Sequence, residues 1–309
     1  MSEIVILGGA NIDIVGYSHH SLIEYDSNPG KIKISYGGVG RNIAENCCRL
    51  EEKVKFATVF GHDHFASILK QHCLEFGFDL SLSKQSLTHS TSIYLAVLDQ
   101  NQDMKIAISD MDLLQEVDDK MVQLVLSACS SENILVMDTN LDQKVIEQVA
   151  RQCACPIYLD PISCAKAVKV KHCLGHIHTL KPNRYEAEIL CGFAIKTKED
   201  KNRALDYFLA AGVREIIISL GDEGVLVAND HERYEICVKP AKVVNATGGG
   251  DSFLAAWIAW RQKELLERCL LATAAAISTI TVLDTVNPQC SRELIEIARN
   301  ELEMEGRRL

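Results

Sequence analysis

The sequence lacks a run of apolar residues long enough to cross a membrane. Its longest stretch without a charged residue, Cys269 to Leu283, covers fifteen residues and is interrupted by threonines and a serine. A membrane-spanning helix needs about 20 apolar residues, so we expect no membrane segment. The first residues, Met1 to Glu3, contain no basic region before the apolar run Ile4–Leu7, so no secretory signal is expected either. These absences predict a cytoplasmic protein.

The sequence also lacks clusters of lysine and arginine. It contains 32 basic and 42 acidic residues, which gives a net charge of −10. A protein that binds polymeric nucleic acid needs a basic surface to neutralise phosphates, so we expect no such partner. With 47% hydrophobic and 24% charged residues in 309, the composition is that of a globular protein, which excludes a disordered chain. The length fits two domains or one large α/β domain.

Cysteine is too dilute for a disulfide scaffold. The twelve cysteines are about 4% of the chain, and we interpret them as free thiols, mostly buried. Cys153 and Cys155 are separated by one residue rather than the two of a zinc knuckle, and no second pair lies at a matching distance, so we interpret them as small buried hydrophobes. The group from His172 to His178 leads into a predicted strand, 177–180, on which adjacent ligands would point to opposite faces. We therefore predict no metal–cysteine site.

Apolar strand-like runs alternate with amphipathic helical patterns along most of the chain. The predicted strands are Ile4–Leu7, Val54–Val59, Ile134–Met137, Ile157–Leu159, Ile177–Leu180, Ile216–Ser219 and Val225–Val227. The predicted helices are Arg41–Leu50, Ala66–Phe76, Lys120–Cys129, Gln143–Ala150, Arg184–Cys191, Lys201–Ala211 and Leu254–Arg261. Continuous apolarity is typical of strands that are buried on both faces of a parallel sheet. The order predicts an α/β fold with a doubly wound, mostly parallel sheet.

Two segments break this alternation. Residues 17–36 carry the turn sequence Ser27–Gly30 followed by the alternating run Lys31–Ile34, and residues 88–110 contain the strand-like run Thr91–Leu98. We interpret them as a small antiparallel β-strand lid inserted into one domain that spans 1–309. Such a flap exposes an edge and one face, so it covers a ligand or pairs with the flap of another subunit.

The strongest chemical signal is the segment Asn245–Ser252, which contains three consecutive glycines, Gly248, Gly249 and Gly250, followed by Asp251. Glycines at a helix N-terminus leave backbone N–H groups free to bind a phosphate or a developing oxyanion. Asp251 in the first turn can accept a proton from a hydroxyl that attacks phosphorus. The alternative is a flexible loop in which Asp251 is a simple N-cap.

Polar residues near two further glycine clusters suit a sugar. Gly38 lies in Gly37–Gly40, where glycines allow a ligand to approach the backbone, and Asn42 can donate to and accept from hydroxyls. Asn11 and Asp13 follow the first strand and share one face if that segment is extended. They suit vicinal hydroxyls, although turn chemistry explains each of them equally well.

Two later segments suit phosphates and a cation. Asn183 and Glu186, in the segment that begins Lys181-Pro182, carry oxygens suited to hydrated Mg²⁺. Ser219, Gly221 and Gly224 form a small turn between two strands that can face a phosphate. Taken alone, the first segment is equally explained as the start of a helix, and the second as the turn of a hairpin.

Together these five segments resemble the ribokinase-like (PfkB) carbohydrate kinases over essentially the whole chain. The boxes that carry the resemblance occur in family order: Gly8…Asn11…Asp13, Gly37-Gly38-x-Gly40-x-Asn42, Lys181-Pro182-Asn183-x-x-Glu186, Ser219-x-Gly221-x-x-Gly224 and Gly248–Asp251. Within that family the chain looks most like the pseudouridine kinases. That closer likeness rests on Ser27–Lys31, Gly37–Asn46, Ser109–Met111, Asp160-Pro161-x-Ser163-x-x-Lys166, Thr179–Arg184 and Val286–Pro288.

The resemblance implies transfer of the γ-phosphoryl group of ATP, with Mg²⁺, to the 5′-hydroxyl of a C-ribosyl nucleoside. It makes Asp251 the base and Gly248–Gly250 the anion hole. It assigns ribose contacts to Asn11, Asp13, Gly38 and Asn42, with Asn140 and Lys166 also on the substrate side. It places Asn183 and Glu186 beside Mg²⁺ and phosphate, where both residues would contact the ion through water. It places Ser219, Gly221, Gly224 and Thr247 beside the nucleotide. A homodimer formed through the lid is expected.

Three departures from the family pattern stand out. The anion hole has glycine at 249 where alanine is usual, which removes no donor. Asn245 stands where aspartate often helps to shape a monovalent-cation loop, so activation by K⁺ is doubtful. The segment His62-Asp63-His64 lacks the last glycine of a Gly-x-Asp-x-x-Gly element, which we interpret as a loop change.

Three other functions compete with pseudouridine phosphorylation. Another nucleoside or sugar kinase would use the same boxes. A catalytically quiet sensor that binds the nucleoside would not need the intact box at Asp251. A nicotinamide oxidoreductase would need a G-x-G-x-x-G fingerprint, which the glycine clusters here do not form.

Overall fold

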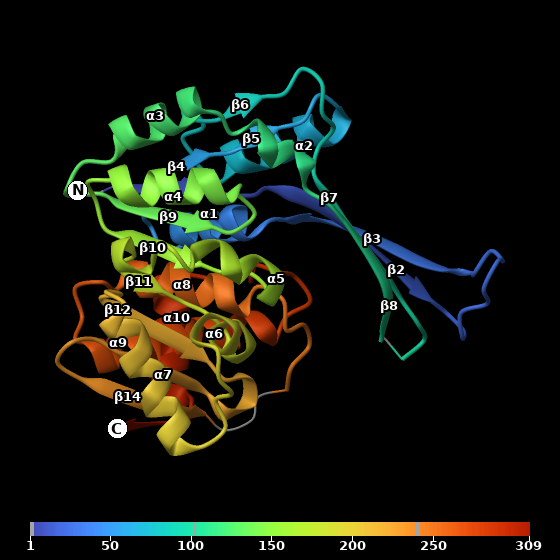
Figure 1. Cartoon of the computed structure of the whole chain (residues 1–309). Helices are drawn as coiled ribbons and strands as arrows, with labels where there is room; N and C mark the ends of the chain where they lie inside the picture. The colour runs from blue at the N-terminus through green and yellow to red at the C-terminus, as the bar shows by residue number, and fades with distance from the viewer. Residues whose placement is uncertain (1–2, 102, 239–241) are drawn as a thin grey trace.

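A nine-stranded sheet with helices on both faces forms the body of the protein (Figure 1). The structure is a computed structural model and describes residues 3–101, 103–238 and 242–309. In spatial order the strands are β15 (Met304–Arg308), β14 (Arg233–Val238), β13 (Val225–Ala228), β12 (Glu215–Ser219), β11 (Thr179–Leu180), β10 (Ile157–Asp160), β9 (Ile134–Asp138), β1 (Ile4–Leu7) and β4 (Val54–Ala57). The neighbouring strands β4, β1, β9, β10, β11 and β12 are parallel to one another. Beyond β12, each of β13, β14 and β15 is antiparallel to the strand before it. The predicted mostly parallel sheet is confirmed.

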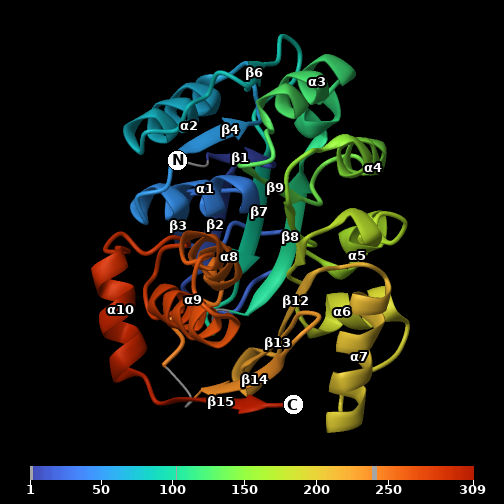
Figure 2. The same cartoon turned by 90° about the vertical axis from the view of Figure 1, so that its left-hand side faces the viewer.

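The helices divide into two layers, one on each face of the sheet (Figure 2). One layer contains α1 (Val39–Arg49), α2 (His64–Glu75), α8 (Gly249–Ala259), α9 (Leu265–Ile280) and α10 (Arg292–Glu301). The other contains α3 (Asp119–Ala128), α4 (Gln143–Gln152), α5 (Cys164–Ala167), α6 (Arg184–Cys191) and α7 (Lys198–Ala210), with short 3₁₀ turns η1 (Asp112–Glu116), η2 (Val168–Val170) and η3 (Leu174–His176). A further 3₁₀ turn, η4 (Gly221–Glu223), links β12 to β13. Burial on both faces explains why every residue of β1 is apolar and fully buried. None of the described helices is both long and apolar enough for a bilayer.

The parallel strands place five loops at one edge of the sheet. The carboxyl ends of β1, β9, β10, β11 and β12 lead into loops that begin at Gly8, Thr139, Pro161, Lys181 and Leu220. The carboxyl edge of an open α/β sheet is where ligands bind, because loops from successive strands converge there.

A second sheet, the lid, projects from the body next to this edge (Figure 1). Its strands lie in the order β3 (Gly30–Gly37), β2 (Asn11–Ser18), β7 (Ile93–Leu98) and β8 (Met104–Asp110). The prediction of a purely antiparallel flap is wrong at one place. Each hairpin is antiparallel, but β2 pairs with β7 in parallel, because both strands leave the body in the same direction. The first lid strand also begins at Asn11, so it contains Asn11 and Asp13 as extended residues.

Two predicted strands are shorter than expected. The run Val54–Val59 breaks at Thr58, where the backbone N–H donates to Ser83 Oγ at 3.1 Å, and the chain continues as β5 (Val59–Phe60) in a separate parallel pair with β6 (Lys84–Gln85). The run 177–180 forms a strand only at Thr179–Leu180, because Ile177 is the C-cap of the 3₁₀ turn η3 and its N–H donates to Leu174 in that turn.

Candidate active site

The glycine segment forms the N-terminus of α8. Gly248 is its N-cap, with φ of 86°, and no side chain caps the helix. A Cβ at Gly248 would lie 1.8 Å from the carbonyl oxygen of Thr285, so both the backbone angle and the space require glycine. The first N–H groups of α8 therefore stay available for an anion. The interpretation of Asp251 as a simple N-cap is wrong, because Gly248 holds that position.

Asp251 lies buried in the first turn of α8, with 7% of its surface exposed. Its Oδ2 accepts a hydrogen bond of 2.7 Å from Asn42 Nδ2, which comes from α1. Burial and the nearby Asp160 carboxylate raise the pKa of Asp251 to about 7, against the opposing effects of Asn42, Lys181 and Arg41. A carboxylate with a pKa near neutrality can accept a proton from a hydroxyl far better than an ordinary aspartate.

Lys181 and Asp160 form a buried ion pair that sequence reasoning missed as functional residues. Lys181 Nζ lies 2.8 Å from Asp160 Oδ2, and both residues are almost fully buried. Although burial lowers it, the pKa of Lys181 is raised, because Asp160 and two other carboxylates surround the ammonium. A Cβ placed on Gly250 would lie 3.0 Å from Lys181 Nζ. The ammonium therefore faces the first turn of α8, where an anion would bind.

Asn183 and Glu186 form the capping box of α6. Glu186 accepts from the backbone N–H and the side-chain amide of Asn183, at 2.8 and 2.7 Å, and Asn183 Oδ1 accepts from the Glu186 N–H at 3.0 Å. Burial and the Asp160 charge raise the pKa of Glu186 to about 7. The capping box accounts for both residues structurally, while each Glu186 oxygen keeps a lone pair for water.

The buried groups of this region fit a bound cation. Asp160, Glu186 and Asp251 provide three carboxylates, and in the part of the chain that the structure describes only one buried ammonium, that of Lys181, lies among them. Carboxylate and amide oxygens are the ligands that Mg²⁺ prefers, usually together with several waters. This donor set fits hydrated Mg²⁺ better than a soft metal.

A cavity of about 630 Å³ opens beside the N-terminus of α8. Gly249 and Gly250 line it together with Lys181 and Asn183. The rest is largely apolar and is lined by Val225, Val243, Ala246, Phe253, Ala276, Ile277 and Ile280, among others. A cavity with largely apolar walls beside the glycine start of α8 fits a nucleotide, whose base is flat and apolar on both faces.

The residues predicted to contact a nucleotide are not all in this cavity. Ser219, Gly221 and Gly224 line it, and the last has φ of 101° with Ile236 O only 1.9 Å from a would-be Cβ. Gly224 is thus also required by packing against β14. Thr247 is exposed and does not line the cavity. Its N–H donates to Asn245 Oδ1 at 3.0 Å instead.

Asn245 is engaged within its own loop. Besides accepting from Thr247, its Nδ2 donates to the carbonyl oxygen of Leu283 at 3.1 Å. The carbonyl oxygen of Leu283 therefore accepts from two donors, Asn245 Nδ2 and Lys33 Nζ, the latter at 3.3 Å.

Asn11 and Asp13 lie at the base of the lid on one face of β2. Asn11 Nδ2 donates to Asp13 Oδ1 at 2.6 Å. Burial raises the pKa of Asp13, against the opposing effects of Asn11 and Arg41. A Cβ on Gly37 would lie 2.4 Å from Asp13 Oδ1, so this glycine makes room for the carboxylate. Gly38 follows with φ of 99°, close against the carbonyl of Gly9.

Asp138 joins the loops on this side of the site. One of its oxygens accepts from the N–H groups of Gly9 and Gly40, at 2.8 and 2.9 Å, and the other accepts from the N–H of Asn140 at 2.9 Å. Lys166 Nζ donates to Asn140 Oδ1, so these two predicted residues do meet. Burial lowers the pKa of Lys166, against the opposing charge of Asp138. Sequence reasoning missed Asp138, whose only signal was its place at the end of a buried strand.

Arg41 connects the lid to α1. It is 1% exposed, and it donates to the carbonyl oxygens of Tyr36 and Gly37 at 2.9 and 3.0 Å. It also donates to Glu45 and to Asn42 Oδ1, which fixes the Asn42 amide with Nδ2 toward Asp251. The root of the lid and the candidate base are therefore linked by a chain of three hydrogen bonds.

Comparisons with known proteins agree with this arrangement. Residues 1–291 match the pfkB family of carbohydrate kinases. A pseudouridine kinase of Escherichia coli (strain K12) is 35% identical over 255 residues, which covers 82% of this chain and 81% of that protein. An uncharacterized sugar kinase of the same organism is 33% identical over 81% of this chain and 70% of its own length. The solved structure of a candidate sugar kinase from Clostridium perfringens superposes with a TM-score of 0.89 at 30% identity, covering 100% of this chain and 99% of that one. The chain belongs to the pfkB family of carbohydrate kinases, enzymes that transfer a phosphoryl group to an alcohol of a sugar or nucleoside.

Proposed function

We propose that this protein transfers the γ-phosphoryl group of ATP to the 5′-hydroxyl of pseudouridine. The observation that carries the proposal is the buried Asp251, which lies in the first turn of α8 next to free backbone donors and is held by Asn42. Similarity to the pseudouridine kinase of Escherichia coli supports the choice of nucleoside. The apolar cavity beside Gly249 supports the choice of a nucleotide donor.

Each side chain has a distinct task in this proposal. Asn11 and Asp13 bind the two ribose hydroxyls, which leaves the 5′-hydroxyl free to approach Asp251. Asp251 accepts the proton of that hydroxyl as its oxygen attacks phosphorus. The N–H groups of Gly249 and Gly250 and the ammonium of Lys181 stabilise charge on the transferring group. Mg²⁺, when bound through water near Glu186, would neutralise charge on the phosphates.

A direct assay tests the proposal. Purified protein is incubated with ATP, Mg²⁺ and, separately, pseudouridine, uridine, adenosine or ribose, and the phosphorylated product is identified by ³¹P NMR. We expect a 5′-phosphate monoester, formed fastest from pseudouridine. Faster phosphorylation of ribose or adenosine would favour a different sugar or nucleoside kinase activity. That activity is the second candidate function, because a sugar kinase is 33% identical to this chain. Binding without any transfer would favour a sensor.

Lys166 and Asn140 are our candidates for recognition of the base. Pseudouridine differs from uridine in carrying a ring N–H in place of a C–H, so discrimination needs an acceptor. Asn140 Oδ1 already accepts from Lys166 and keeps one lone pair for that N–H. We expect Lys166→Ala to lower kcat/KM for pseudouridine by at least about tenfold, because the amide loses its fixed orientation. Any activity on ribose should be spared. An equal loss on both substrates would contradict a role in base recognition.

The lid should become more ordered when a nucleoside binds. Asn11 and Asp13 belong to β2, so a ribose bound to them ties the lid strands to the body. We expect hydrogen exchange in residues 30–37 and 93–98 to slow by about tenfold or more with saturating pseudouridine. Unchanged exchange in both segments would contradict closure.

The face of the lid turned away from Asp13 supports a homodimer. In register across the four strands lie Ile34, Ile14, Leu95 and Ile108, and the next row contains Ile32, Val97 and Ile106. Ile32, on one edge strand, and Ile106 and Ile108, on the other, are 75%, 55% and 58% exposed, which is unusual for isoleucines that share one face of a sheet. We propose that a second copy of the lid covers them. Light scattering should give the mass of a dimer, and Ile106→Lys with Ile108→Lys should give that of a monomer, whereas a monomeric unsubstituted protein would contradict the proposal.

A further inference from the structure

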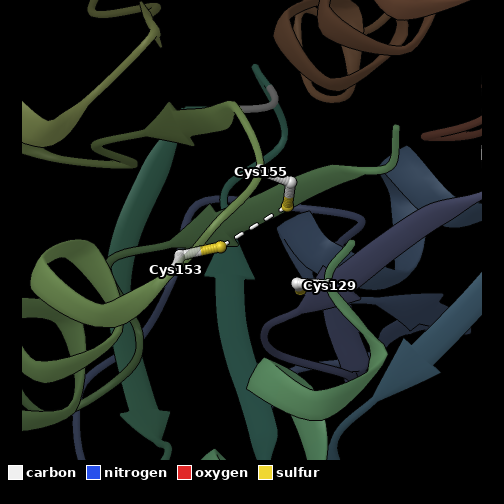
Figure 3. Close-up of side chains that lie close together, drawn as sticks. All are labelled: Cys129, Cys153 and Cys155. Atoms are coloured by element: carbon white, nitrogen blue, oxygen red, sulfur yellow. Dashed lines mark hydrogen bonds between the residues drawn. The ribbon is translucent and has the colours of Figure 1, made fainter. Parts of the chain in front are cut away.

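Three cysteine side chains from separate parts of the chain meet at the edge of the sheet opposite to Asp251. Cys129 follows α3 and precedes β9, and Cys153 and Cys155 follow α4 and precede β10, so all three lie at the amino ends of strands whose carboxyl ends face the active site. The Sγ atoms of Cys153 and Cys155 are 3.4 Å apart (Figure 3). All three sulfurs lie within 4.8 Å of one another.

The backbone positions these sulfurs for local reasons. Cys153 ends α4 in an extended conformation, φ −68° and ψ 133°, and side chains two residues apart on an extended segment point to the same side. Pro156 disfavours helical angles at Cys155, which keeps the segment extended. Cys129 ends α3 in an extended conformation as well, φ −90° and ψ 90°. Two helix ends therefore converge on one group of thiols.

The spacing of the sulfurs fits a metal ion. Zinc–sulfur bonds are about 2.3 Å long, so two sulfurs on one ion, at tetrahedral or trigonal angles, lie about 3.8–4.0 Å apart. The Cys153–Cys155 separation of 3.4 Å is a few tenths of an ångström shorter than this, and no pair of the three sulfurs is more than 4.8 Å apart. A disulfide requires about 2.05 Å and would leave the third sulfur unused. Cys129 and Cys155 are buried, at 5% and 6% exposure, while Cys153 is half-buried and gives an ion access.

We propose that Cys129, Cys153 and Cys155 bind a soft d¹⁰ cation through three thiolates. Thiolates select Zn²⁺ and Cu⁺ over hard cations such as Mg²⁺, so this site and the active site would take different metals. The described residues offer no fourth histidine, cysteine or carboxylate in the cluster. Zn²⁺ would therefore add an external ligand, whereas Cu⁺ accepts three. The interpretation of the Cys153–Cys155 pair as small hydrophobes overlooked Cys129, which is 24 residues away in the sequence.

The ion would join the carboxyl ends of α3 and α4, which otherwise touch through apolar side chains and one hydrogen bond of 3.4 Å from Gln123 to Gln152. A ligand that binds only the folded state raises its stability. Because the cluster lies at the opposite edge of the sheet from Asp251, we expect an effect on thermal stability and none on phosphoryl transfer.

Cadmium is a suitable probe, because its thiolate complexes absorb in the ultraviolet. Fully reduced protein, with its thiols counted beforehand, is titrated with Cd²⁺ without oxygen. We expect one tightly bound Cd²⁺ per chain with a charge-transfer band, and a higher Tm. Cys153→Ser and Cys155→Ser should each weaken binding by at least about tenfold, because even the loss of a residue that hydrogen-bonds to a metal ligand lowers metal affinity by that factor. Cys164→Ser, which replaces the exposed cysteine outside the cluster, should bind like the unsubstituted protein.

Parallel titrations with Zn²⁺ and with Cu⁺, each against a competing chelator, show which ion the three thiolates prefer. Retention of the cadmium charge-transfer band in both Cys153→Ser and Cys155→Ser would overturn the proposal. Failure to form a stoichiometric complex with any of Cd²⁺, Zn²⁺ and Cu⁺ would also overturn it. Formation of a Cys153–Cys155 disulfide under mild oxidant, in protein that binds none of these ions when reduced, would instead assign the cluster to redox chemistry.

Discussion

Replacement of Asp251 by asparagine should lower kcat by at least about 10²-fold and leave the affinity for nucleoside within about threefold. The amide keeps the shape of the carboxylate and can still accept from Asn42, but it cannot take up the proton of the attacking hydroxyl. Turnover and binding are measured separately, the latter by calorimetry without ATP. Asp230→Asn, on the surface, is the matched control. Turnover near that of the unsubstituted protein would remove Asp251 from the mechanism.

The pH dependence gives this prediction a second readout. With a pKa of about 7 in the free protein, Asp251 is largely protonated at pH 6, so kcat/KM should rise between about pH 6 and 8. An acid limb that ends near pH 5 would contradict the raised pKa.

The stability of the folded protein should change with pH in the opposite direction to kcat/KM. The pKa of Asp251 is higher in the folded state than the ordinary aspartate value near 4, so the folded state binds an extra proton between about pH 4 and 7. That contribution to stability is present below pH 4 and is lost as the pH rises through 7. Asp251→Asn removes the buried charge, so its Tm relative to the unsubstituted protein should be higher at pH 8 than at pH 5. A constant difference in Tm would contradict this linkage.

Replacement of Asp13 by alanine should lower kcat/KM for the nucleoside by at least about 10²-fold, with KM for ATP little changed. A carboxylate that accepts from two hydroxyls makes two charge-assisted hydrogen bonds, each with a typical contribution of about 1.5–3 kcal/mol. The lid should stay intact, because Asp13 bonds to Asn11 and not to another strand's side chain. Asp103→Ala, an exposed carboxylate elsewhere in the lid, is the control. Equal changes in both KM values would point to general damage to the lid.

The fold was predictable where the signal was local. β1, β9 and β10 are continuous apolar runs, and burial on both faces produces that pattern. The parallel pairing of β2 with β7 was not predictable, because about 75 residues separate the two strands and each hairpin alone looks antiparallel. The pattern within a hairpin does not show how it joins another.

The same distinction applies to the site. The glycine start of α8 was predictable because Gly248–Asp251 are contiguous and their chemistry depends on backbone geometry. The pairing of Lys181 with Asp160 and the raised pKa of Asp251 were not predictable. Both depend on side chains that come from separate parts of the chain and are buried together. Asn183 and Glu186 show the converse case, in which a contiguous motif has a structural use that the motif alone does not reveal.

Competition between pseudouridine and uridine in one reaction with ATP tests the central claim most directly. Both nucleosides are supplied at equal concentration, and the ratio of the two 5′-phosphates at low conversion gives the ratio of their kcat/KM values. A site with a fixed acceptor near the base should favour pseudouridine by at least about tenfold, because a missing N–H leaves a buried acceptor unpaired. A ratio near one, or one in favour of uridine, would contradict the assignment of pseudouridine as substrate.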